Sequence, residues 1–527
     1  MITLLDYGAG NVRSVINAIE NLGETVHLAD SGEEIANAER LVFPGVGAFG
    51  SMMQILNKKG YVEPLKAFLE SGRPFFGICV GMQALFEASE ESFGTKGLGI
   101  FKGSVKRFDI DLAVPHIGWN GINVKKPSLI FNGLTGDEKL YFVHSYYVAP
   151  EDSSVTLTTT NYAIEFASSV QKGNIIGTQF HPEKSGKAGQ QILANFLAVD
   201  RDKVMPPEVR TETQLAKRII ACLDVRSNDQ GDLVVTKGDQ YDVREAGTVR
   251  NLGKPVELAE RYYQEGADEI TFLNITGFRD FPLEDMPMIA VLKQTSKNVF
   301  VPLTIGGGIR DYTDANGKTY TSLEVAAEYF RAGADKVSIG SDAVLIAEDY
   351  LKTGQKTGKS AIERISRVYG NQAVVISVDP RRVYVQSPKA VNHTVIETAR
   401  PGPKGERYCW YQCTIKGGRE GRDLDAVALA KACEDLGAGE ILLNCIDKDG
   451  TNSGFDIELI NTVKNAVTIP VIASSGAGNA QHFAEVFKET AAESALAAGI
   501  FHRREVPISE VKNYLDGKVV IRKPDYS

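Results

Sequence analysis

The sequence predicts an α/β protein in two parts: an open, mostly parallel sheet with helices, followed by a (β/α)8 TIM barrel built from two (βα)4 halves. Short apolar strands alternate with amphipathic helices along nearly the whole chain, which is typical of parallel sheets. From Arg218 onward this alternation continues for about 300 residues, close to the size of one barrel. Several segments of the second part recur, which indicates two similar halves.

The composition limits the function. The 527 residues are too many for one hydrophobic core, while 43% hydrophobic and 24% charged residues are ordinary for a globular protein. A net charge of -9 argues against a general nucleic-acid binder, and no apolar run approaches the roughly 18 residues of a membrane span. Six irregularly spaced cysteines fit a reducing compartment and show no metal-ligand spacing. We therefore expect no nucleic-acid or membrane partner, no metal and no cofactor. Because the chain opens directly on a strand, we expect a cytoplasmic location, or a plastid if a transit peptide was removed.

The first part begins with short strands that alternate with helical patterns. The expected elements are three strands and one helix, at Ile2–Leu5, Thr25–Leu28, Arg40–Phe43 and Val12–Leu22. Pro44–Gly47 (PGVG) follows the third strand, at the edge of the sheet where ligands bind. This turn can aim the N–H groups of Val46 and Gly47 into the crevice, although a plain strand-to-helix turn explains the motif equally well.

Residues Pro74–Gln83 read PFFGICVGMQ, an apolar strand followed by a sharp turn and a helix. Gly77 and Gly81 permit the strained backbone that holds Cys79 clear of the sheet. The positive N-terminus of the following helix favours a thiolate. Cys79 is therefore a candidate nucleophile, although a buried core cysteine fits this motif equally well when it stands alone.

Residues Ile175–Lys184 read IIGTQFHPEK and predict a strand that runs through His181 to Glu183. Side chains two residues apart on an extended segment share a face, so Glu183 can orient His181 and stabilise its imidazolium. A cysteine elbow with a histidine and a glutamate about a hundred residues later, in one α/β unit, indicates a nucleophilic triad.

Through PGVG, GICVGMQ and QFHPEKS, the chain from about Met1 to Ala198 resembles the class I glutamine amidotransferases. The resemblance implies that Cys79 attacks the glutamine amide, His181 transfers protons and Glu183 orients the histidine. It also implies oxyanion and glutamine contacts from Gly45, Val46, Gly47 and Gln83. The implied products are glutamate and ammonia.

The polar segment 200–217, which contains Pro206-Pro207, predicts a linker between domains at 1–199 and 218–527. Three near-copies in the second domain each suggest a helix end followed by a buried strand; they begin at Gly266, Gly333 and Gly437. A longer repeat of about 160 residues pairs Asp224 with Asp379, Gly307 with Gly476 and Gly340 with Gly499.

Both barrel halves thus place an aspartate at the end of their first strand, and glycine-rich loops after their third and fourth strands. Carboxylates on opposite sides of a barrel mouth suit acid–base chemistry on one substrate. Each glycine-rich loop alone is explained by an ordinary turn, but a symmetric pair can present N–H groups to two phosphates. We therefore expect a substrate with two phosphate groups.

The motifs ACLDV, VTKGDQ, GADKVSIGSDAV, VVISVDPRRV, LLNCIDKDGTNSG and IPVIASSGAG resemble the cyclase subunit of the imidazole glycerol phosphate synthase family. With the first domain fused ahead of it, the chain is similar to the bifunctional form of fungi and plants. The resemblance implies the substrates glutamine and PRFAR, a bis-phosphate ribulosyl formimino-aminoimidazole carboxamide ribonucleotide. The implied products of this step of histidine biosynthesis are imidazole glycerol phosphate and the ribonucleotide AICAR, so a glutaminase is coupled to a lyase.

The same resemblance implies roles for residues of the barrel. Asp224 and Asp379 would be the general acid/base pair, Lys237 would lie over the mouth, and Asp447 would support them. The implied phosphate contacts are Gly307, Gly308, Gly340, Ser341, Gly450, Ser475, Gly476 and Gly499. Gly340 stands where many relatives have asparagine, so a side-chain contact is not expected there. The segments that exceed a minimal barrel, without predicted chemistry, are Tyr312–Ser322, Thr353–Lys359 and Gln386–Tyr411.

Ammonia is mostly protonated in neutral water, so we expect the first domain to cap the barrel's amino-terminal end and pass ammonia through it. Four charged residues occur at strand starts: Arg218, Glu269, Lys336 and Glu440. Each alone is explained as surface charge, but burying them requires pairing, and two cations with two anions predict a salt-bridged gate. The family resemblance implies the same gate, and Lys184 is expected to pair with Asp335.

Two alternatives remain at this point. The first is another ammonia-channelling synthase with a different acceptor in the barrel, against which the barrel motifs argue. The second is a catalytically silent scaffold, against which Cys79, His181, Glu183 and both barrel aspartates argue. Because both domains lie in one chain, we expect a monomer.

Overall fold

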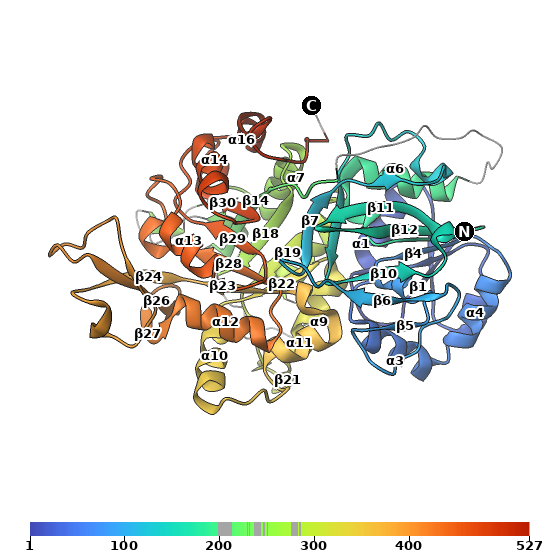
Figure 1. The fold of residues 1–527 in the computed structure, drawn as a ribbon, viewed down its shortest axis with the longest axis horizontal. Helices are drawn as coiled ribbons and strands as arrows, with labels where there is room; N and C mark the ends of the chain where they lie inside the picture. The colour runs from blue at the N-terminus through green and yellow to red at the C-terminus, as the bar shows by residue number, and fades with distance from the viewer. Residues whose placement is uncertain are drawn as a thin grey trace.

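The computed structural model describes residues 1–198, 213–228, 230, 232–236, 244–245, 248–249, 251–275, 283 and 286–525. Figure 1 shows two α/β units side by side along the long axis, the N-terminal unit from blue to teal and the barrel from green to red. Among the helices that the structure describes, none combines the length and the apolar character needed to cross a membrane.

The N-terminal unit is built on an 11-stranded sheet with the central order β2-β1-β3-β4-β13-β12-β10-β6-β5. Its first five strands run parallel, as the sequence predicts, and place the turns after β3 and β4 at one edge. Strands β12, β10 and β6 add an antiparallel extension that the sequence did not predict. The strands are β1 Ile2–Leu5, β2 Val26–Ala29, β3 Leu41–Phe43, β4 Phe75–Ile78, β5 Ala88–Ser89, β6 Gly103–Arg107, β7 His116–Asn120, β8 Asn123–Val124, β9 Leu140–His144, β10 Tyr146–Pro150, β11 Thr156–Tyr162, β12 Ile164–Lys172 and β13 Ile175–Thr178.

The first helix of this unit begins at the predicted Val12 and ends at Asn21, one residue before the predicted end. The side chain of Asn11 accepts a hydrogen bond from Ser14 N, which explains why the first helix starts at Val12. The helices are α1 Val12–Asn21, α2 Gly32–Asn37, α3 Phe49–Lys59, α4 Val62–Glu70, α5 Val80–Gln83 and α6 Gly186–Leu197. Strand β13 ends at Thr178, so the prediction of an extended segment through Glu183 is wrong: Pro182–Lys184 form a 3-10 turn. Proline suits this turn because its fixed φ is favourable at the first position of a helix.

The second unit is a closed eight-stranded parallel barrel, which confirms the predicted fold. Each strand pairs with the next, and β14 closes the ring by pairing with β30. The strands are β14 Arg218–Ser227, β18 Glu269–Asn274, β19 Leu303–Gly306, β22 Lys336–Ile339, β23 Val374–Val378, β28 Glu440–Asn444, β29 Val471–Ser474 and β30 Ser494–Ala497. The helices are α7 Pro255–Gln264, α8 Pro287–Thr295, α9 Ser322–Ala332, α10 Ser341–Thr353, α11 Ala361–Tyr369, α12 Ala426–Leu436, α13 Ile457–Lys464, α14 Ala480–Glu489, α15 Gly499–His502 and α16 Ile508–Leu515.

Two glycines show the internal repeat in atomic detail. Gly307 and Gly476 have φ of +93° and +99°. A Cβ atom would lie 2.2 Å from the Asn274 carbonyl oxygen at the first and 2.3 Å from the Gly454 carbonyl oxygen at the second. Both halves therefore require glycine at the same step, because only glycine combines this backbone angle with so close an approach.

Strands outside the barrel ring come from the loops. Strand β15 Leu233–Thr236 pairs with β14, and the short pairs are β16 Arg244–Glu245 with β17 Thr248–Val249 and β20 Tyr312–Thr313 with β21 Thr319–Tyr320. A larger addition, here called the inserted sheet, consists of β24 Pro380–Val385, β25 Val395–Glu397, β26 Tyr408–Ile415 and β27 Glu420–Asp425. In Figure 1 the inserted sheet projects from the barrel on the side away from the N-terminal unit. The guanidinium of Arg382 ties it to the barrel through Asp456 at 2.7 Å and Glu458 at 2.8 Å.

The N-terminal unit packs on the amino-terminal ends of the barrel strands. Trp119 donates its indole N–H to the Asp268 carbonyl, one residue before β18, at 3.1 Å. Asn17 on α1 donates to Ser296 Oγ at 2.9 Å, just after α8. One cluster of buried apolar side chains continues through both units, so they share a core.

The C-terminal residues also join the two units. Arg522 donates to Asp268 at 2.8 Å, and its guanidinium lies 4.4 Å from the centre of the Trp119 ring. The Asp525 carboxylate accepts a hydrogen bond from Lys187 N at 3.3 Å, at the start of α6. The end of the chain therefore holds the barrel and the N-terminal unit together.

Candidate active sites at the two ends of the barrel

Cys79 lies on a strained elbow between β4 and α5. Its φ of 52° and ψ of -109° are rare for a residue with a side chain, and its N–H donates to the Thr178 carbonyl at 2.6 Å. A Cβ on Gly81 would lie 2.4 Å from the Phe43 carbonyl oxygen, so glycine lets the turn after the cysteine approach β3. The thiol is thus fixed at the edge of the sheet, with its side chain 6% exposed.

His181 and Glu183 form a buried pair. Nδ1 of His181 is 2.8 Å from Oε1 of Glu183, and each residue is 3% exposed. Burial lowers the pKa of His181, but the charges of Glu183 and Cys79 outweigh it and raise this pKa well above its usual range. Nε2 of His181 is buried and has no hydrogen-bond partner among the described residues, so it is available to exchange a proton with the thiol or a leaving group.

The PGVG turn contacts both units. The Tyr7 hydroxyl donates to the Val46 carbonyl at 2.7 Å. A Cβ on Gly47 would lie 3.2 Å from the Val368 carbonyl oxygen of helix α11, and Ala48 N, directly after the turn, donates to that carbonyl at 3.0 Å. The turn is close to α5 as well, because a Cβ on Gly45 would lie 2.4 Å from the backbone nitrogen of Gly81. The orientation of this turn is therefore linked to a helix of the barrel.

The predicted glutamine contact, Gln83, donates hydrogen bonds to one side chain and one backbone carbonyl. Its Nε2 is 3.1 Å from both Gln179 Oε1 and the Tyr146 carbonyl oxygen. Gln179 in turn donates to the Cys79 sulfur at 3.4 Å. The sequence analysis missed Gln179, although it stands two residues before His181 in the same motif.

Glu91 is a second residue that the sequence analysis missed. Burial raises the pKa of its carboxyl to about 7, although a hydrogen bond from Phe49 N at 2.7 Å opposes this shift. Phe49 begins the helix that follows the PGVG turn. No motif singles out this glutamate, because its contact joins segments 42 residues apart.

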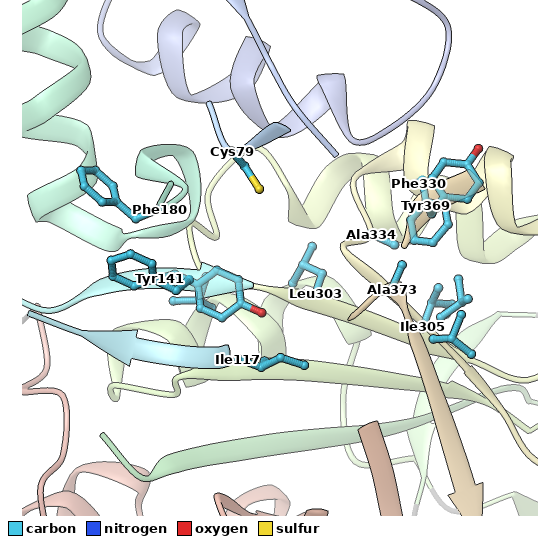
Figure 2. Close-up of a cluster of buried hydrophobic side chains, with 14 of the residues drawn as sticks. Cys79, Ile117, Tyr141, Phe180, Leu303, Ile305, Phe330, Ala334, Tyr369 and Ala373 are labelled. Atoms are coloured by element: carbon cyan, nitrogen blue, oxygen red, sulfur yellow. The ribbon is translucent and has the colours of Figure 1, made fainter. Parts of the chain in front are cut away.

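Tyr141 lies between the triad and the barrel floor. Its ring centre is 6.5 Å from that of His181, and its hydroxyl is buried without a hydrogen-bond partner in the described chain. Burial and the nearby Glu269 raise the pKa of Tyr141 well above its usual range. Figure 2 shows the Cys79 sulfur pointing toward the region of Tyr141 and the barrel residue Leu303. The sequence analysis did not select Tyr141.

The four charged residues at the strand starts form a closed ring of ion pairs. Lys336 Nζ lies 2.7 Å from Glu269 and 2.6 Å from Glu440, and Arg218 pairs with Glu269 at 2.7 Å and with Glu440. All four side chains are fully buried. Burial raises the pKa of Glu440, but Arg218 and Lys336 outweigh it and hold this pKa below its usual value.

One further ion pair connects the triad to this ring. Lys184 follows Glu183 and pairs with Asp335, which precedes Lys336, at 2.8 Å. Asn11 donates to the other oxygen of Asp335, also at 2.8 Å. This ion pair therefore joins the residue next to Glu183 in the N-terminal unit to the residue next to Lys336 in the barrel ring.

The other end of the barrel opens into a cavity of about 620 Å³. Asp224, three residues before the end of β14, and Asp379, directly after β23, both line it. Asn444 donates to the Asp379 carboxylate at 2.8 Å, and the Thr414 hydroxyl donates to the Asp379 carbonyl at 2.7 Å. These hydrogen bonds from β28 and β26 hold Asp379 in a fixed position.

The cavity collects the predicted phosphate residues of both halves. The predicted residues that line it are Gly307, Gly308, Gly340, Ser341, Gly450, Ser475, Gly476 and Gly499. Asp447 is not among the described lining residues; its carboxylate accepts a hydrogen bond from Arg382 N at 2.7 Å. Asp449, two residues later, lines the cavity instead. Lys237 lies outside the residues that the structure describes.

Three charged residues of the cavity wall, Arg310, Arg419 and Arg503, were also missed by the sequence analysis. They stand outside the recurring glycine and aspartate motifs, so no pattern singled them out. Within the described ranges, no group of three or more His, Cys, Asp and Glu side chains is arranged to hold a metal ion.

Comparison with known proteins agrees with this division of the chain. Residues 3–199 match the family model described as Glutamine amidotransferase class-I, and residues 218–507 match the model described as Histidine biosynthesis protein. The chain is 60% identical to the chloroplastic imidazole glycerol phosphate synthase hisHF of Arabidopsis thaliana, across 98% of this chain and 88% of that protein.

Two fungal proteins named imidazole glycerol phosphate synthase hisHF are also similar along almost their whole length. The Schizosaccharomyces pombe protein is 56% identical and the Emericella nidulans protein 53% identical, each across 98% of both chains. The chain therefore belongs to the hisHF family of bifunctional imidazole glycerol phosphate synthases.

Proposed function

We propose that residues 1–199 hydrolyse glutamine and that residues 218–527, joined through the linker 200–217, use the ammonia to convert PRFAR into imidazole glycerol phosphate and AICAR. The observation that carries this proposal is the placement of two reactive sites at opposite ends of one barrel, with a buried ring of four charges between them. A silent scaffold has no need for such a ring, since buried charges are costly to maintain.

In the glutaminase, Cys79 attacks the carboxamide carbon, and Nε2 of His181 receives the thiol proton and passes it to the leaving ammonia. Glu183 stabilises the imidazolium through its contact with Nδ1. Backbone N–H groups of Gly45, Val46 and Gly47 are the proposed oxyanion donors, and Gln83 a glutamine contact. Water then cleaves the thioester and releases glutamate.

Ammonia next enters the barrel past Tyr141 and the gate of Arg218, Glu269, Lys336 and Glu440. Beyond the gate, the barrel interior is lined by apolar residues such as Ile220, Val375 and Leu442, which disfavour the charged ammonium ion. This supports delivery of neutral ammonia to the cavity.

In the cyclase, Asp224 and Asp379 act as the general acid/base pair on opposite sides of the substrate. The glycine-rich loops of the two halves bind its two phosphate groups through backbone N–H groups. Lys237 is proposed to cover the mouth, and Asp447 to act indirectly through Arg382. No metal or cofactor takes part in this scheme.

Because the two units share one chain and an internal interface, the proposed assembly is a monomer without nucleic-acid or membrane partners. The proposed location is the cytoplasm or a plastid. The Arabidopsis relative, which is named as chloroplastic, supports the second of these.

The test uses Cys79→Ala in the full chain. We expect loss of glutamine-dependent turnover with retention of the reaction driven by ammonium salts, because only ammonia production requires the thiol. Cys433→Ala, at a buried cysteine of α12, is the matched control and keeps both activities. Glutamine-dependent turnover in Cys79→Ala would exclude the proposed nucleophile.

A second measurement tests the coupling of the sites. Bound PRFAR is expected to stimulate glutamine hydrolysis strongly, since the PGVG turn contacts helix α11 of the barrel. Equal glutaminase rates with and without PRFAR would contradict this coupling.

A further inference from the structure

The turn between β26 and β27 of the inserted sheet reaches the cavity. Lys416, Gly417 and Arg419 line its wall together with Gly340 and Ser341. The backbone N–H of Lys416 donates to Ser341 Oγ at 3.0 Å. The inserted sheet therefore touches a residue proposed to bind phosphate.

This turn is held in a defined position. Lys416, Gly417 and Gly418 have φ of 57°, 65° and 79°, and such a conformation at Lys416 is unfavourable for a residue with a side chain. Beyond the turn, Arg422 makes a two-pronged ion pair with Glu348 of α10, with both contacts at 2.8 Å. The sheet thus fixes the turn against the helix that begins at Ser341.

The charges of the turn are suited to an anion. Lys416 Nζ is 2.8 Å from Glu420, a contact near the surface that can be exchanged for another anion. Arg419 makes no ion pair or hydrogen bond through its side chain in the part of the chain that the structure describes. A guanidinium that shares a cavity wall with a serine hydroxyl and the N-terminus of a 13-residue helix provides groups that bind phosphate.

We propose that Arg419, assisted by Lys416, binds the phosphate group that occupies the Gly340–Ser341 side of the cavity, so that the inserted sheet forms part of the substrate site. This inference deepens the proposed cyclase function and rests on it for the identity of the substrate. Lys416 exchanges Glu420 for the phosphate, while Arg419 gains a charged partner. The ligand class is a phosphate monoester.

The first experiment measures the ammonium-driven cyclase reaction with varied PRFAR. Arg419→Gln is expected to raise KM about tenfold with little change in kcat, as expected for loss of one charge-assisted hydrogen bond. Arg419→Lys restores part of the affinity because it keeps the charge. Arg407→Gln is the matched control: Arg407 lies on the same inserted sheet region, is exposed, pairs with Glu397 and does not line the cavity. An unchanged KM in Arg419→Gln, or an equal rise in Arg407→Gln, overturns the inference.

The second experiment separates this inference from the proposed function. Inorganic phosphate is expected to raise the Tm of the wild-type chain. The rise should be smaller in Arg419→Gln and as large as in the wild type in Arg407→Gln. If the wild type fails to convert PRFAR while this difference in Tm remains, the proposed substrate is wrong and the phosphate site stands. An identical Tm rise in wild type and Arg419→Gln overturns the site whatever the substrate is.

Discussion

The two ends of the barrel hold their reactive groups in opposite ways. At the amino-terminal end, Cys79, His181 and Glu183 are 6%, 3% and 3% exposed and bonded to their own surroundings. At the other end, Asp224 and Asp379 border a cavity of about 620 Å³ whose wall includes glycine-rich loops and charged arginines. The site at Cys79 is buried, and its side chains are already paired with one another. The site at Asp224 and Asp379 is an open cavity whose arginines can bind an anionic ligand.

This difference follows from what each end must do. Glutamine is small and its product ammonia must be kept from water, so a buried site next to the barrel floor is an advantage. A substrate with two phosphates is large and strongly hydrated, so its site must be reached from solvent and must replace water with N–H groups and cations. Substitutions at one end should therefore change one half-reaction and leave the other intact.

Asp379→Asn should separate the two ends most strongly. Loss of the proposed general acid/base group is expected to lower the ammonium-driven cyclase rate by about 10²- to 10⁴-fold, while glutamine hydrolysis without PRFAR is unchanged. Separate assays of the two half-reactions measure this. Asp423→Asn is the control, because the Asp423 side chain is 98% exposed on β27. A parallel loss of both activities in Asp379→Asn would break the contrast.

Glu440→Gln should destabilise the ring of buried ion pairs that separates the two ends of the barrel. It leaves Arg218 and Lys336 with one carboxylate for two cations, and removing one partner of a buried ion pair costs about 3–5 kcal/mol of unfolding free energy. Denaturant unfolding measures this cost, and the ratio of glutamate to imidazole glycerol phosphate should rise as ammonia escapes. Glu397→Gln, in an exposed pair, should cost at most about 1 kcal/mol.

The same ring of ion pairs predicts that the free energy of unfolding depends on pH in the acidic range. The pKa of Glu440 is lowered in the folded chain, so its ionised form adds stability that is present above its ordinary value of 4.5. That stability is lost as pH falls through the lowered pKa of the folded state. Below pH 4.5, the free energy of unfolding should therefore fall less steeply with decreasing pH in Glu440→Gln than in the wild type. An identical decline would remove Glu440 from the acid response.

Tyr7→Phe should act on the closed end alone. It deletes the hydrogen bond to the Val46 carbonyl, a contact of about 1 kcal/mol, and frees the PGVG turn to rotate its N–H groups toward the thiol. Glutamine hydrolysis without PRFAR is expected to rise about fivefold, with the ammonium-driven reaction unchanged. Tyr61→Phe, which loses a bond to the Asp30 carbonyl, is the control. A lower basal rate would argue that Tyr7 holds the turn in its active orientation.

Gly340→Asn should have the smallest effect. A Cβ at Gly340 meets only Ser377, at an ordinary 3.8 Å, so the fold tolerates the change and KM for PRFAR falls slightly if the amide reaches phosphate. Gly307→Asn provides the contrast, since a Cβ there lies 2.2 Å from the Asn274 carbonyl oxygen. Thermal unfolding and KM distinguish the two variants. Equal destabilisation by both would show that the backbone at Gly340 is packed as tightly as at Gly307.

Sequence reasoning reached the parts of the molecule that are encoded locally. The elbow at Cys79, the paired glycines Gly307 and Gly476, and the charged strand starts each need only a few neighbouring residues and a parallel fold to be recognised. The fold class could be predicted for the same reason. His181 and Glu183 were paired correctly in space, but through a turn and not through an extended strand.

The remaining features depend on contacts between distant segments. Glu91 meets Phe49, Gln179 meets Cys79, and the turn at Arg419 meets the helix that begins at Ser341 only after folding. Asp447 and Asp449 differ by two residues in the chain, and only the loop conformation decides which of them lines the cavity. No periodicity or motif in a single sequence carries that information.

The C-terminal contacts of Arg522 and Asp525 have a consequence for synthesis. The glutaminase half leaves the ribosome first and can fold while the barrel is still incomplete. Its junction with the barrel, however, includes the Arg522 guanidinium over the Trp119 ring and the hydrogen bond from Lys187 N to Asp525, and both of these barrel-side residues follow all eight barrel strands. A nascent chain that has not yet reached Asp525 therefore lacks these contacts, so the glutaminase half reaches its full junction with the barrel only after the barrel strands have been made.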